Sequence, residues 1–141
     1  MAGLLVACGS GPVDVEAPQP SAAAAEECAV LLAELPDVVA DQDRRDVSPE
    51  DVLAGAWGDP AIVLRCGVPE PEGLRPSSAC FVVNDVGWFA REREDEVVFT
   101  TIGRSTNVEM TVPNDYAPEA NALPAVAGPI QQATSELRPC V

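Results

Sequence analysis

The sequence contains no histidine and no lysine, so all eight of its basic residues are arginines. Without histidine, the Ser–His and Cys–His nucleophile systems of many hydrolases are excluded. The five cysteines form no C-x-x-C pair, so the usual zinc patterns are excluded as well. Walker and dinucleotide-binding glycine patterns are also absent. We therefore expect neither a cofactor nor a bound metal.

Positive charge is scarce in this chain, which has 23 acidic residues and a net charge of −15. Nothing here neutralises phosphate on the scale that nucleic acid requires, so a nucleic-acid partner is excluded. Acid–base catalysis needs two carboxylates held apart in a cleft, but most of these acids fall in loops and turns. A non-enzymatic role is favoured, and a carboxylate-dependent extracytoplasmic hydrolase acting on cell-wall material is the alternative.

The N-terminal segment Leu5–Cys8, followed by glycine, resembles a bacterial lipobox, in which the cysteine becomes the lipidated first residue of the mature protein. Met1–Ala7 is shorter than a signal peptide and contains no basic residue. Either the true start lies upstream or the match is a coincidence. We interpret residues 1–8 as a truncated signal peptide with Cys8 as the lipidation site, which predicts attachment to the outer face of the cell membrane.

Residues 9–22 are rich in proline and small residues and show no apolar pattern, which predicts a flexible tether of roughly 20 Å. Residues 23–141 are predicted to form a single α+β domain. Apolar spacing predicts a helix over 23–35 with Ser21 as its N-cap, and a second helix over about 125–136. A short helical turn is expected within 48–56. Strands are predicted at 61–64, 81–83, 88–91, 97–101 and 107–112.

The expected architecture is a mainly antiparallel sheet of four to five strands, with the N- and C-terminal helices packed on one face. Four cysteines lie within this domain and predict two disulfides, although buried free thiols are the alternative. Of the three pairings, we expect Cys66–Cys80 and Cys28–Cys140. The first pair flanks a loop that we take to join adjacent strands, and the second pair lies at the ends of the domain.

Three strings make a specific pattern: WGDPAIVLRCGVP at 57–69, CFVVNDVGWF at 80–89 and FTTIGR at 99–104. Together with Cys140 they resemble an actinobacterial family of secreted, often lipidated envelope proteins, catalogued as a domain of unknown function, number three-five-one-five. The resemblance covers about residues 28–140. It implies an exported location and paired cysteines, and it implies no activity, cofactor or catalytic residue.

The candidate binding residues are Arg65, Arg104, Trp57 and Trp88. Both arginines follow apolar runs at strand ends, and an arginine in an apolar motif is either paired with an acid or kept for an anion. In the first case we expect pairing with a local acid such as Asp59 or Asp85 and stacking on a tryptophan. In the second case, guanidinium groups and aromatic faces form a pocket for a carboxylate, phosphate or sugar-acid group near Trp88. The expected partners are thus the membrane, through a lipid at Cys8, and an envelope protein or a small anionic ligand.

Overall fold

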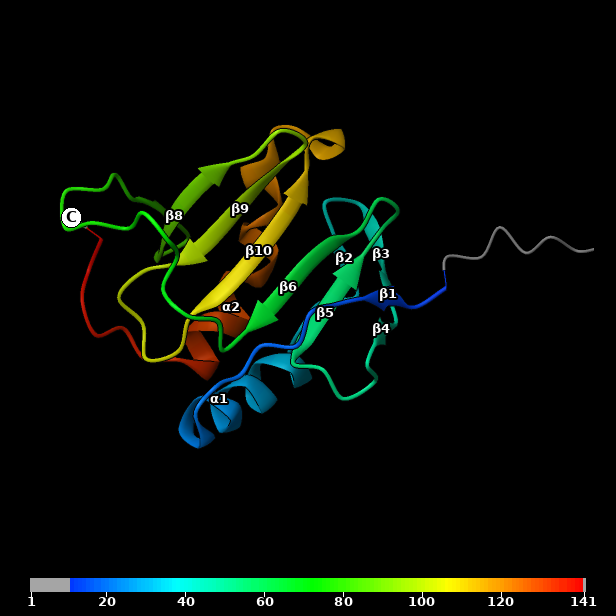
Figure 1. Cartoon of the computed structure of the whole chain (residues 1–141), viewed down its shortest axis with the longest axis horizontal. Coiled ribbons are helices and arrows are strands. Elements are labelled where there is room, and N and C mark those ends of the chain that lie inside the picture. The colour runs from blue at the N-terminus through cyan, green and yellow to red at the C-terminus, as the bar shows by residue number, and fades with distance from the viewer. Residues whose placement is uncertain (1–10, 141) are drawn as a thin grey trace, which may run out of the picture.

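Residues 11–140 are described in a computed structural model, in which two helices pack against an eight-stranded antiparallel sheet (Figure 1). The strand order is β2 (Val38–Val39), β3 (Gln42–Arg45), β5 (Ala54–Trp57), β6 (Ile62–Cys66), β10 (Val108–Pro113), β9 (Glu96–Thr101), β8 (Val86–Glu92) and β7 (Phe81–Val83). Helix α1 (Ala22–Ala33) packs against helix α2 (Pro124–Ala133), and two 3-10 turns, η1 (Asn114–Tyr116) and η2 (Glu119–Ala122), precede α2. Within residues 11–140, neither helix has the length and hydrophobicity of a membrane-spanning segment.

The α+β class and the five predicted strands, β6 to β10, are confirmed, but the predicted total of four to five strands is wrong. The three further strands have weak sequence signals. Strand β5 is Ala-Gly-Ala-Trp, with no β-branched residue, and β2 and β3 lie in a polar stretch. The helical turn expected within 48–56 is also wrong, because this segment ends strand β4 (Val47–Ser48) and then forms β5.

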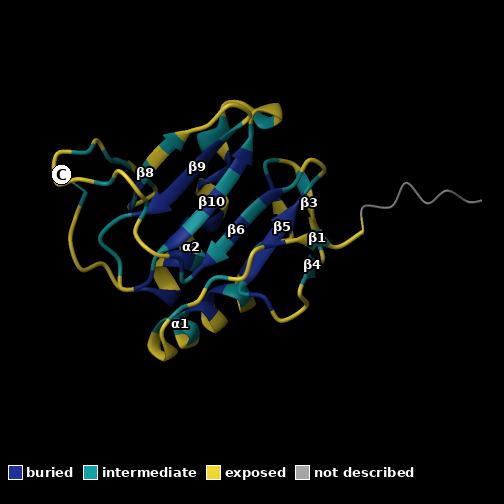
Figure 2. Ribbon diagram, viewed as in Figure 1, coloured by how far each residue is buried: buried dark blue, intermediate teal, exposed yellow. Residues whose placement is uncertain are grey.

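The core lies between the sheet and the helices, and the strands alternate accordingly (Figure 2). On β10, Val108, Met110 and Val112 are buried on the helix-facing side, while Glu109 and the other intervening residues point to the opposite face. Helix α1 begins as predicted, because the Ser21 side chain accepts a hydrogen bond from the backbone N–H of Ala24. The sequence periodicity therefore determines which face of the sheet is buried against the helices and which face points away from them.

The segment from Gly11 to Pro20 does not form the predicted flexible tether. Strand β1 (Val13–Asp14) pairs in parallel with β4, and Val15 is buried against Val52 and Ala54. In Figure 1 the blue chain that follows β1 crosses in front of β5. The apolar residues at 13 and 15 alternate with acids, and this short pattern is enough to dock the segment on the domain. Residues 9 and 10, like the predicted lipobox and Cys8, lie outside the described residues.

The structure contains two disulfides, as predicted in number, but their pairing is Cys28–Cys66 and Cys80–Cys140. The predicted pairing is wrong because β6 and β7 are not neighbours. Strands β10, β9 and β8 lie between them, so Cys66 and Cys80 belong to different parts of the sheet. Cys66 ends β6 beneath the inner side of α1, where Cys28 is buried, at a Cα–Cα distance of 5.6 Å. Cys80 instead meets the C-terminal tail.

Candidate functional site

A cavity of about 870 Å³ lies where strand β6 ends, and three arginines line it: Arg65, Arg104 and Arg138. We call it the arginine cavity. Its wall combines the segment 16–21, the first turn of α1, the loop 67–70 after β6, the loop 104–107 between β9 and β10, and the C-terminal tail at 137–138. Its volume is within the usual range for small-molecule sites. The structure thus places Arg65 and Arg104 on one cavity from segments far apart in the sequence.

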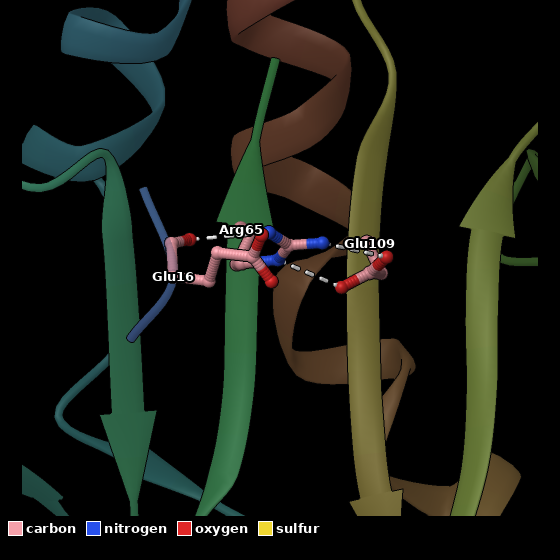
Figure 3. Close-up of polar contacts among 3 residues, drawn as sticks. All are labelled: Glu16, Arg65 and Glu109. Atoms are coloured by element: carbon pink, nitrogen blue, oxygen red, sulfur yellow. Dashed lines mark hydrogen bonds and ion pairs between the residues drawn. The ribbon is translucent and has the colours of Figure 1, made fainter. Parts of the chain in front are cut away.

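Arg65 is neutralised by a carboxylate on the neighbouring strand. Its Nε donates to Oε1 of Glu109 at 2.9 Å and its Nη2 donates to Oε2 at 3.2 Å (Figure 3). Residues 65 and 109 are direct cross-strand partners in the β6–β10 ladder, which makes this two-point contact possible. Nη1 donates to the backbone carbonyl of Glu16 at 3.1 Å. The hydrogen bond to Glu109 raises the pKa of Arg65, and the partners predicted from the sequence, Asp59 and Asp85, are incorrect.

Arg104 has no ion pair among the described residues. Its Nε donates to Oγ1 of Thr134 at 2.6 Å and its Nη2 donates to the Thr134 carbonyl at 2.9 Å. Burial lowers the pKa of Arg104, and the charges of Glu136 and Glu27 oppose this effect. An arginine stays protonated in a protein, so the shift reports a guanidinium that is partly desolvated with incomplete compensation. Such a group favours an anion nearby.

The carboxylate of Glu27, on α1, is engaged by hydroxyl groups of the loop after β9. Its Oε2 accepts from Ser105 Oγ at 2.8 Å and its Oε1 accepts from Thr106 Oγ1 at 2.6 Å. These hydrogen bonds hold the loop 105–106 against α1. Glu27 therefore positions Ser105 and Thr106, which line the arginine cavity, and does not form an ion pair with Arg104.

Arg138 is placed by the backbone. The amides of Leu137 and Arg138 both donate to the carbonyl of Gly103, at 2.6 and 3.0 Å. Gly103 has a φ of 72° and approaches the tail so closely that a Cβ would collide with the carbonyl oxygen of Arg138. The Cys80–Cys140 disulfide fixes the tail two residues later. Arg138 has no ion pair among residues 11–140.

A second cavity of about 510 Å³ adjoins the first and shares Glu70 and Arg138 with it. We call it the apolar cavity, because side chains such as Leu74, Ile102 and Pro139 line it together with the Cys80–Cys140 disulfide. The two cavities together are lined by four of the eight arginines (65, 75, 104 and 138) but by only two of the 23 acids (16 and 70). Positive charge is therefore concentrated here in an otherwise acidic chain.

Neither predicted tryptophan lines these cavities. Trp57 and Trp88 are fully buried in the core, and the cation that stacks on Trp57 is Arg44, at 5.4 Å from the ring centroid. Trp57 Nε1 donates to the carbonyl of Pro36 at 2.9 Å. Trp88 Nε1 has no hydrogen-bond partner among residues 11–140. The prediction of a mixed arginine–tryptophan pocket is thus wrong in its aromatic part, because the tryptophans face the helices.

Sequence reasoning missed Arg138 and Arg75. Both lie in irregular segments, which carry no periodic pattern that would place a side chain. The available signal was the position of Arg138 two residues before a disulfide-bonded cysteine. Residues 11–140 contain no group of acids and cysteines that could hold a metal ion.

The match to known families covers residues 2–138, nearly the whole chain, and is to the family described as "Protein of unknown function (DUF3515)". The chain belongs to this family. Searches of curated proteins and of solved structures gave no significant match. Membership in DUF3515 carries no activity, so the function has to be argued from the cavities.

Proposed function

We propose that this DUF3515 protein is a non-enzymatic, membrane-anchored extracytoplasmic module that binds a small anionic ligand in the arginine cavity. The observation that carries the proposal is that Arg104 and Arg138 line one cavity and neither has an ion pair in the described part of the chain. A carboxylate, a phosphate or a sugar-acid group supplies the missing counter-charge. Arg65 shapes the wall, but Glu109 already balances its charge.

The disposition of the polar groups supports a small ligand. Arg104 is half-buried and held by Thr134, so its guanidinium is oriented before any ligand arrives. Ser21, the N-cap of α1, also lines the cavity, and a helix N-terminus adds partial positive charge. Preorganised donors reduce the entropy that binding costs. The hydrolase alternative has no specific observation in its favour, because Glu16 and Glu70, the two carboxylates that line the cavity, are solvent-exposed.

The extracytoplasmic location is supported by the two disulfides, since such bonds persist in oxidising compartments. The membrane anchor rests on the lipobox-like sequence at Cys8 alone. Expression in the native host with a functional upstream signal tests it. Wild type is expected in the membrane fraction and Cys8→Ser in the soluble fraction, because the acyl chains of a lipoprotein give stable anchoring. Equal partition of the two proteins contradicts the anchor.

Anion binding is tested by thermal unfolding in the presence of carboxylates, phosphates and sugar acids. A ligand at one hundred times its Kd stabilises the folded state by about 2.7 kcal/mol. This stabilisation should be lost in Arg104→Met and in Arg138→Met. Arg93→Gln is the matched control, because Arg93 is exposed and lines neither cavity. If no anion stabilises the wild type, or if Arg93→Gln loses as much as the cavity variants, the proposal fails.

A further inference from the structure

We infer that the ligand is an amphiphilic anion, whose charged group binds in the arginine cavity and whose short apolar chain enters the apolar cavity. This inference rests on the proposed function and adds the chemical class of the ligand. It is carried by the junction of the two cavities, since Arg138 lines both. A molecule bound at Arg138 therefore has a polar space on one side and an apolar space on the other.

The apolar side chains that line the apolar cavity come from three separate segments of the chain. Leu74 comes from the loop after β6, Ile102 from the end of β9, and Pro139 from the C-terminal tail. All three residues are at least partly exposed to solvent, including the apolar Leu74 and Ile102. The disulfide Cys80–Cys140 joins the tail to the strand β7 side of this cavity. An apolar concavity that the fold keeps open beside a cationic cavity fits a ligand with both characters.

The charges at the junction select against other ligands. Glu70 lines both cavities and is exposed, so a second anionic group on the ligand would meet a like charge there. A neutral apolar molecule leaves Arg104 without a counter-charge, and an inorganic anion leaves the apolar cavity filled with water. One anionic group joined to an apolar chain satisfies both spaces.

The backbone makes the junction rigid. The carbonyl of Gly103 accepts hydrogen bonds from the amides of Leu137 and Arg138, and Ser105 N donates to the Ser135 carbonyl at 2.8 Å. The tail therefore runs along the loop between β9 and β10 and keeps Arg138 at the boundary. In Figure 1 the C-terminal tail, in red, returns towards the green loop that follows β6.

A series of monoalkyl phosphates tests this inference by calorimetry, with methyl, butyl and hexyl phosphate all below their critical micelle concentrations. Affinity is expected to rise by up to about four-fold for each methylene buried in the apolar cavity. Hexanol is expected not to bind. Leu74→Gln should reduce the gain in affinity with chain length while leaving the affinity for inorganic phosphate unchanged. Arg138→Gln should weaken the binding of every anion in the series.

The outcomes separate the two claims. If inorganic phosphate binds but chain length adds nothing, the amphiphile is wrong and the anion site stands. If no phosphate compound binds, the amphiphile is wrong, and the anion site is wrong too when the carboxylates and sugar acids of the thermal-unfolding screen also fail to stabilise the wild type. A chain-length gain that Leu74→Gln leaves intact also overturns the inference, because the chain then binds elsewhere. Vesicles containing phosphatidic acid, offered as competitors of hexyl phosphate, distinguish a membrane lipid from a soluble amphiphile as the source of the same chemistry.

Discussion

The contrast between Arg65 and Arg104 makes the sharpest prediction about stability. Arg65 forms a two-point contact with Glu109, and the two side chains are 22% and 18% exposed. Exposed ion pairs contribute about 0.2–1 kcal/mol, whereas breaking a buried pair costs about 3–5 kcal/mol. This half-buried pair lies between those limits. We therefore expect Arg65→Met to lower the free energy of unfolding by about 2 kcal/mol, because Glu109 loses its partner.

The assay is urea unfolding of the disulfide-intact protein, with Arg65→Met, Glu109→Gln and the double variant forming a double-mutant cycle. We expect a coupling energy of about 1–2 kcal/mol, since the double variant leaves neither charge unpaired. Arg104→Met leaves no carboxylate without an ion-pair partner, so we expect it to lower the free energy of unfolding by about 1 kcal/mol or less. Zero coupling in the cycle, or an equal loss in Arg104→Met, would refute the distinction between a paired and an available arginine.

Three further predictions concern the core, the disulfides and the tyrosine. Trp57→Phe should cost about 1–2 kcal/mol more than Trp88→Phe in the same unfolding assay, because the Trp57 indole N–H has an acceptor to leave unpaired and that of Trp88 has none within the described residues. Equal costs would contradict this reading. Mild thiol treatment, followed by alkylation and peptide mapping, should reduce Cys80–Cys140 first, because the other disulfide is fully buried. Reduction of the buried disulfide first would exclude the order. Tyr116 is the sole tyrosine. Burial, and to a smaller extent the charges of nearby carboxylates, raise its pKa above 10.0. Its phenolate absorbance should appear late in a pH titration, and the folded state, which holds this proton more tightly, should lose stability as the pH rises above about 10. A phenolate transition at or below 10.0 would contradict the shift.

The sequence predicts the regular part of the fold well and the irregular part poorly. Strands β6 to β10 and both helices follow from apolar periodicity, which depends only on local spacing. Strand β5 has small residues that become strand through pairing with β6 on one side and β3 on the other. The prediction of the disulfide pairing was wrong for a related reason. It depends on the order of strands in the sheet, and in the sequence nothing shows that three strands separate β6 from β7.

The candidate site divides in the same way. Arg65 and Arg104 could be selected from the sequence because each ends an apolar run, and the structure places both on the arginine cavity. The register explains why the tryptophans do not join them. Trp57 is paired with Ile62 on the helix-facing side, whereas Arg65, three residues after Ile62, points to the opposite face. The position of Arg138 depends on hydrogen bonds between a loop and the tail, and no local sequence pattern indicates these bonds.

The most direct test of the central claim is to observe the arginine side chains while an anion binds. The absence of lysine and the presence of only eight arginines give a simple NMR spectrum of the Nε–Hε groups. The signals can be assigned by single Arg→Gln variants. On addition of inorganic phosphate, the signals of Arg104 and Arg138 are expected to shift and saturate together, while those of Arg65, held by Glu109, and Arg93 stay in place. Unchanged signals for Arg104 and Arg138, or a uniform shift of all eight arginines without saturation, would contradict an anion site in the arginine cavity.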